Sequence, residues 1–120
     1  GELSMMKVGD DGVGSCVVED EQSDIKVQSV TIDSLTFEDR VGLIKFDIEG
    51  YEINALNGAI ETIKKHKPVL LISVYHLWLQ PEQIFECKKF VENLNMGYQF
   101  KFVHLQPERD LVYEYMLVCW

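Results

Sequence analysis

Two continuous apolar runs, residues 43–48 and 69–75, dominate the hydrophobic pattern of the chain. Runs of this length, without alternating polar positions, are typical of buried strands in a parallel sheet. Between them, apolar side chains recur every three or four positions, which predicts a helix over residues 51–66 that Pro68 ends. A strand, a helix and a second strand in this order predict a βαβ unit, in which the two strands are parallel neighbours.

The other segments show shorter patterns. Residues 3–31 contain short apolar stretches separated by turn-forming and acidic residues, which predict short antiparallel strands. An apolar stripe predicts a second helix over residues 82–95. Alternation over residues 98–105 and an apolar run over 111–119 predict a β-hairpin at the carboxyl end. Together these elements predict an α/β fold in three layers, with a mixed sheet and helices packed on it.

A polar connection lies between the short strands and the first long apolar run. In it, Asp33 or Ser34 could cap a short helical turn that runs to Asp39. We therefore divide the chain into a β-rich region over residues 1–35 and a βαβαββ core over residues 42–120. Both belong to a single domain.

Composition narrows the classes of partner and location. The net charge of −9, from 20 acidic and 11 basic residues, argues against nucleic acid or an anionic membrane as a partner. No apolar run approaches the roughly 20 residues of a membrane span, and the opening residues do not resemble a secretion signal. Cys16, Cys87 and Cys119 are widely spaced, which fits a reducing cytoplasm and predicts neither a disulfide framework nor structural zinc.

Polar groups gather where the first apolar run ends. Asp47 and Glu49 lie two positions apart and share one face for as long as the strand lasts. Gly50 allows a tight turn, and the next helix brings Glu52 and its positive dipole end to the same place. Ligands bind outside the carboxyl ends of strands in open α/β sheets, so this is a candidate site. The alternative is that these carboxylates cap the following helix.

A lysine and two histidines are further candidates. Lys45 shares the strand face of Asp47 by parity, and we expect it to pair with a carboxylate rather than with substrate. His76 follows the second apolar run at the same sheet edge, and could act as a base or substrate ligand or be a structural histidine. His104 follows aromatic strand residues, where a packing role is the stronger expectation.

Three motifs together resemble the FkbM-type methyltransferases, which use S-adenosylmethionine. The motifs are Thr-Ile-Asp-Ser-Leu at 31–35, Ile-Lys-Phe-Asp-Ile-Glu-Gly-Tyr-Glu at 44–52 with Ala-Leu-Asn-Gly-Ala at 55–59, and Pro-Val-Leu-Leu-Ile-Ser-Val-Tyr-His at 68–76. The resemblance covers nearly all of residues 15–120. It implies a Rossmann-like methyltransferase fold, of which this chain carries the carboxyl-terminal half, because the family's glycine-rich cofactor loop and acidic ribose partner have no counterpart here.

The resemblance also implies a function. It implies methyl transfer from S-adenosylmethionine to a hydroxyl of a sugar or other small metabolite, with Asp47 next to the cofactor. We take Asp47 and His76 as candidate catalytic residues, Asp47, Glu49 and Gly50 as candidate cofactor-binding residues, and no residue as a metal ligand. Two alternatives stay open: a metal-dependent hydrolase that uses Asp47, Glu49 and His76 as ligands, and a non-enzymatic binding or assembly module.

The resemblance has consequences for association and activity. Half of the family's sheet is absent from this chain, which would leave the edge of the strand that bears Asp47 without a neighbour. Such edges pair with other chains. We therefore expect a homodimer, strand exchange, or coverage of the edge by residues 3–31. We also expect the 120 residues alone to be inactive.

Overall fold

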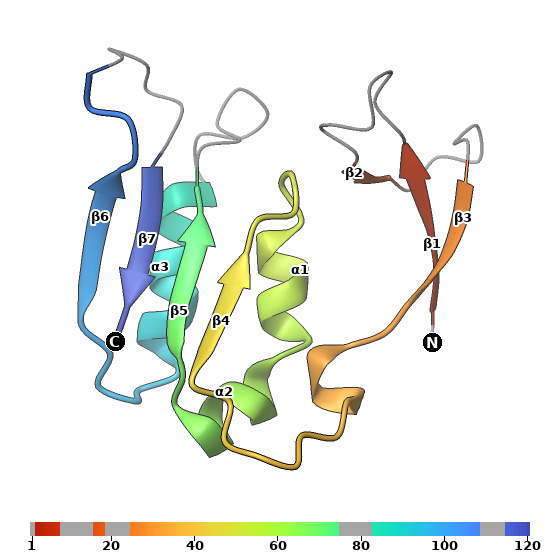
Figure 1. Ribbon diagram of the computed structural model, residues 1–120, viewed down its shortest axis with the longest axis horizontal. Coiled ribbons are helices and arrows are strands. Elements are labelled where there is room, and N and C mark those ends of the chain that lie inside the picture. The colour runs from red at the N-terminus through yellow and green to blue at the C-terminus, as the bar shows by residue number, and fades with distance from the viewer. Residues whose placement is uncertain (1, 8–15, 19–24, 75–82, 109–114) are drawn as a thin grey trace.

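The computed structural model describes residues 2–7, 16–18, 25–74, 83–108 and 115–120. Its described part contains a four-stranded sheet with helices packed on it and a separate three-stranded sheet formed by the first strands of the chain (Figure 1). His76 and the first residues of the predicted last strand lie outside the described residues.

The four-stranded sheet contains both long apolar runs. Its strands, in spatial order, are β4 (Leu43–Phe46), β5 (Val69–Ser73), β7 (Tyr115–Cys119) and β6 (Phe100–His104). β4 and β5 are parallel, whereas β7 is antiparallel to both β5 and β6. The predicted βαβ pairing and the carboxyl-terminal hairpin are therefore confirmed. β4 and β5 each end two residues earlier than predicted.

The prediction of one continuous helix over residues 51–66 is wrong, because two helices form there. They are α1 (Glu52–Asn57) and α2 (Ile60–His66). The 3₁₀ turn η1 (Ile32–Ser34) docks at the break, where the Asp33 N–H donates to the Gly58 carbonyl at 2.8 Å. The contact is close, since a Cβ added to Gly58 would lie 3.2 Å from the Cβ of Thr31. A distant segment thus takes a carbonyl that a continuous helix would use itself.

Alternate strand residues face the helices and form the core. The fully buried members from the strands and helices are Leu70, Ile72, Leu117, Cys119, Leu56, Ile63, Cys87 and Val91. The last two come from α3 (Gln83–Asn93), the second helix predicted from the sequence. On β4 the positions of the opposite parity, Leu43 and Lys45, are exposed, whereas on β5 Leu71 is half-buried and Ser73 is buried. The described helices cover one sheet face, so the third layer expected from the sequence is not seen among the described residues.

The amino-terminal strands form their own sheet. They are β1 (Glu2–Lys7), β2 (Cys16–Val18) and β3 (Ile25–Ser29), in the antiparallel order β2-β1-β3. This confirms the prediction of short antiparallel strands. Among the described strand pairings, none joins this sheet to β4, so the expected coverage of the β4 edge by strand pairing does not occur there.

Candidate functional site

The candidate site lies at the carboxyl end of β4. Lys45 Nζ and Asp47 Oδ2 form an ion pair of 2.7 Å, so the predicted internal pairing of Lys45 is confirmed. The Asp47 side chain is 29% exposed, which leaves it within reach of a ligand in solution. The partner cation balances its charge without burying it, and an ion pair this exposed contributes little to stability.

The chain then leaves the strand conformation abruptly. β4 ends at Phe46, and both Glu49 (φ 54°) and Gly50 (φ 95°) adopt left-handed backbone conformations. β4 ends before Asp47, so the strand alternation that would place Asp47 and Glu49 on one face does not extend to either residue. Gly50 makes the predicted tight turn, since a residue without a Cβ adopts positive φ at no steric cost.

A buried carboxylate holds this loop. Glu52, only 2% exposed, accepts hydrogen bonds at Oε1 from the backbone N–H of Ile48 (3.2 Å) and of Gly50 (3.4 Å). Glu52 is the first residue of α1, so its side chain reaches back over the turn that precedes its own helix. These hydrogen bonds differ from the capping alternative, because their donors lie in the loop before the helix and not at the helix N-terminus. We call residues 47–51 the β4 loop.

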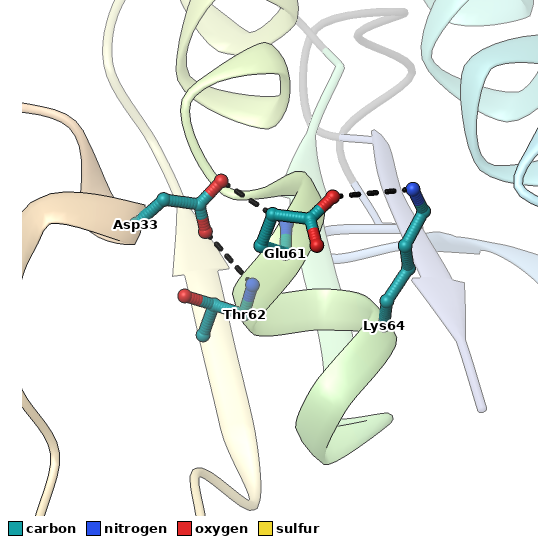
Figure 2. A network of polar contacts seen from close by, with 4 residues as sticks. All are labelled: Asp33, Glu61, Thr62 and Lys64. Atoms are coloured by element: carbon teal, nitrogen blue, oxygen red, sulfur yellow. Dashed lines mark hydrogen bonds and ion pairs between the residues drawn. The ribbon is translucent and has the colours of Figure 1, made fainter.

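A second carboxylate, outside the β4 loop, also accepts two backbone hydrogen bonds. Asp33 accepts hydrogen bonds from the backbone N–H groups of Glu61 (3.0 Å) and Thr62 (2.8 Å), at the start of α2 (Figure 2). Burial raises the pKa of Asp33, but these hydrogen bonds, with help from the Thr62 side chain and Lys64, outweigh it and lower the pKa below 3.8. The prediction of a helical turn capped by Asp33 or Ser34 and running to Asp39 is wrong, because η1 ends at Ser34 and the Asp33 carboxylate caps α2 instead.

The two candidate histidines differ in what the structure shows of them. His76 lies outside the described residues, so the structure does not place it beside Asp47. His104 stacks on Tyr115 with ring centroids 4.7 Å apart, which is the packing role expected. Among the described residues, no group of three or more His, Cys, Asp or Glu side chains is arranged to hold a metal ion, and no helix is long and apolar enough to cross a membrane.

The cysteines of the core are unreactive groups rather than nucleophiles. Cys87 and Cys119 are free thiols within the buried cluster. Burial raises the pKa of each thiol to about 12, and for Cys87 the nearby charge of Glu52 adds to the effect. A thiol reacts as its thiolate, so both are poor nucleophiles at neutral pH.

The sequence pattern pointed to Asp47 and Gly50 but did not reveal the role of Glu52 or the partner of Asp33. For Glu52 the spacing left capping and ligand binding open, and backbone donors in the preceding loop bind its carboxylate. For Asp33 the spacing indicated a local cap, whereas its donors lie far along the chain in α2. The β4 loop can offer a carboxylate at a sheet edge and a backbone held in a fixed shape, which suits the binding of a small polar ligand.

Comparison with known proteins adds independent information. Residues 6–106 match the family described as Methyltransferase FkbM domain. The crystal structure of methyltransferase FkbM from Methylobacillus flagellatus KT aligns with a TM-score of 0.63 and 31% sequence identity. This alignment covers 75% of the present chain and 22% of the Methylobacillus chain. Among the curated proteins, none matches the chain.

Proposed function

Since the chain belongs to the FkbM methyltransferase family, we propose that the protein transfers a methyl group from S-adenosylmethionine to a hydroxyl of a sugar or other small metabolite. The observation that carries the proposal is the partly exposed carboxylate of Asp47, which stands at the carboxyl end of β4 next to a loop of fixed shape. Within the family's mixed α/β fold, this is the edge at which ligands bind.

The residues of the β4 loop fit such a ligand. When bound, S-adenosylmethionine supplies a methyl group already activated for attack by an oxygen. A carboxylate such as Asp47 can accept hydrogen bonds from the ligand's ammonium group or take the proton that the attacking hydroxyl releases. Gly50 and Glu49 would lie beside the ligand, and the absence of a side chain at Gly50 allows close approach to the backbone. We keep His76 as a proposed base.

The first test is substitution of Asp47 in the intact protein. We expect Asp47→Ala to weaken S-adenosylmethionine binding at least about tenfold, because a charged hydrogen bond contributes roughly 1.5–3 kcal/mol. Titration calorimetry measures the affinity, and thermal unfolding checks that the fold is kept. The matched control is Asp39→Ala, which removes an exposed carboxylate outside the β4 loop. Equal affinity of wild type and Asp47→Ala would contradict the assignment.

A second test concerns the 120 residues alone. The family's glycine-rich loop and acidic ribose partner have no counterpart in this sequence, so a site made by these residues cannot enclose the adenosine. We expect S-adenosylmethionine to bind them no more tightly than about 1 mM, or roughly −4 kcal/mol. Micromolar binding in calorimetry would show that the cofactor site is complete within the chain.

Partners and location extend the same proposal. The net charge of −9 supports a small-molecule acceptor rather than nucleic acid or a membrane surface. The free thiols of Cys87 and Cys119 are compatible with a reducing compartment, and we propose a cytoplasmic location. Fractionation with probing of each compartment tests the location.

A further inference from the structure

Ser73 has an unusual environment at the end of β5. Its side chain belongs to a residue that is 1% exposed, and its Oγ has no hydrogen-bond partner. Among the described residues, it is the one buried side-chain nitrogen or oxygen in this state. Buried hydroxyls are nearly always hydrogen-bonded, because leaving one unpaired costs free energy. An exception at the carboxyl end of a parallel strand, where ligands bind in α/β sheets, is a candidate for ligand binding.

The strand register places Ser73 beside Asp47. In the parallel β4–β5 pair, Lys45 lies opposite Leu71 and Phe46 opposite Ile72. Asp47 directly follows Phe46 at the end of β4, and Ser73 directly follows Ile72 as the last residue of β5. β4 and β5 are parallel and point the same way, so their carboxyl ends lie at the same end of the sheet (Figure 1).

Ser73 and Asp47 also lie on the same face of the sheet. Ile72 is fully buried in the core beneath the helices, so its neighbour Ser73 projects from the opposite face. Lys45 lies on that opposite face too, and its ion pair with Asp47 keeps the carboxylate there. The residue after β4 and the last residue of β5, Asp47 and Ser73, therefore lie at the carboxyl ends of neighbouring parallel strands, on one face of the sheet.

This pair matches one kind of ligand group. A carboxylate accepts hydrogen bonds, and a hydroxyl both donates and accepts. An amino-acid group carries an ammonium that donates to both and a carboxylate that accepts from the hydroxyl. We propose that the Ser73 hydroxyl binds the amino-acid end of S-adenosylmethionine next to Asp47. The inference rests on the proposed function. The unpaired hydroxyl lowers the stability of the unliganded protein and gains its partner when the ligand binds.

The experiment compares two ligands in the intact protein. S-adenosylhomocysteine carries the amino-acid end, whereas 5′-methylthioadenosine has the same nucleoside without it. In calorimetry we expect Ser73→Ala to weaken S-adenosylhomocysteine binding about tenfold or more, the equivalent of one hydrogen bond to a charged group, and to leave 5′-methylthioadenosine binding unchanged. The same variant should unfold at an equal or higher temperature than wild type without ligand, because it removes the unpaired hydroxyl.

The matched control is Thr62→Val, which removes a buried hydroxyl in α2, away from the β4 loop. The hydroxyl of Thr62 has a partner, Asp33, so this variant should be less stable but bind both ligands as wild type does. Unchanged S-adenosylhomocysteine affinity in Ser73→Ala, as expected if only water meets the hydroxyl, would overturn the proposal. An equal loss for both ligands would overturn it too. If wild type binds neither ligand, the proposed function itself fails.

Discussion

The carboxylate of Asp33 accepts a hydrogen bond of 2.8 Å from the backbone N–H of Thr62, a residue 29 positions further along the chain. With the bond from the Glu61 N–H, it supplies acceptors for the first turn of α2, and Lys64 pairs with the Glu61 side chain on the same helix (Figure 2). The first N–H groups of a helix have no partner within the helix itself. The connection after β3 is thus fastened to the middle of the βαβ unit.

Replacement of Asp33 should lower stability in a pH-dependent way. We expect Asp33→Ala to reduce the free energy of unfolding by about 1 kcal/mol at neutral pH, the usual cost of losing a helix cap. The folded-state pKa of Asp33 is lowered below 3.8, so its contribution is present above that pH and is lost as the pH falls through the folded-state value. Urea unfolding of wild type and variant should show the difference shrinking below pH 3.8. A constant difference would contradict the role of the charge.

Replacement of Glu52 should affect both stability and ligand binding. Glu52→Ala leaves two loop N–H groups without this acceptor, and we expect a loss of roughly 1–3 kcal/mol in the free energy of unfolding. Because the β4 loop also carries Asp47 and Gly50, S-adenosylmethionine binding by the intact protein should weaken as well. Glu52→Gln keeps an oxygen acceptor and should lose less of both.

Asp33→Ala is the matched control for Glu52, since it also removes a carboxylate that accepts two backbone N–H bonds. It should lower stability without weakening ligand binding, because α2 carries none of the candidate site residues. Calorimetry on both variants, at a temperature where both are folded, separates the two effects. If Glu52→Ala and Asp33→Ala weakened ligand binding equally, the loss would follow from lower stability alone, and Glu52 would have no specific role in shaping the β4 loop.

The buried thiols should react only when the chain unfolds. The pKa of Cys87 and of Cys119 is raised to about 12, so iodoacetamide at pH 8 should modify both residues far more slowly in the native chain than in urea. Mass spectrometry of the peptides that contain each residue measures this. Unfolded thiols ionise near pH 9.0, so the stability due to these groups should decline as the pH rises from 9.0 toward 12. Rapid native labelling would contradict their burial.

The edge of β4 should promote self-association of the 120 residues. β4 pairs with β5 on one side, no described strand pairs with its other side, and Leu43 is 54% exposed. We expect concentration-dependent dimers in sedimentation velocity, which Leu43→Lys should weaken by placing a charge on the edge strand. Leu35→Lys is the control, because Leu35 is 50% exposed but lies outside the sheet. A monodisperse monomer at high concentration would refute this prediction.

The sequence by itself determined the elements whose signals are local. The apolar runs became β4 and β5, and their order along the chain made them parallel neighbours. Parity along β4 predicted the pairing of Lys45 with Asp47, and a glycine at position 50 predicted the tight turn. These features follow from side-chain alternation, apolar burial and backbone sterics, which depend on only a few neighbouring residues and can be read from the sequence.

The tertiary structure alone decided the break between α1 and α2 and the roles of Asp33 and Glu52. The apolar stripe over 51–66 favours one helix, but η1 approaches Gly58 closely and Asp33 supplies α2 with its own cap. Glu52 turns back to the β4 loop instead of facing a ligand. A carboxylate bonds to whichever unpaired N–H groups the fold brings within reach. Those of Asp33 lie 28 and 29 residues away, and those of Glu52 come within reach only through the shape of the β4 loop.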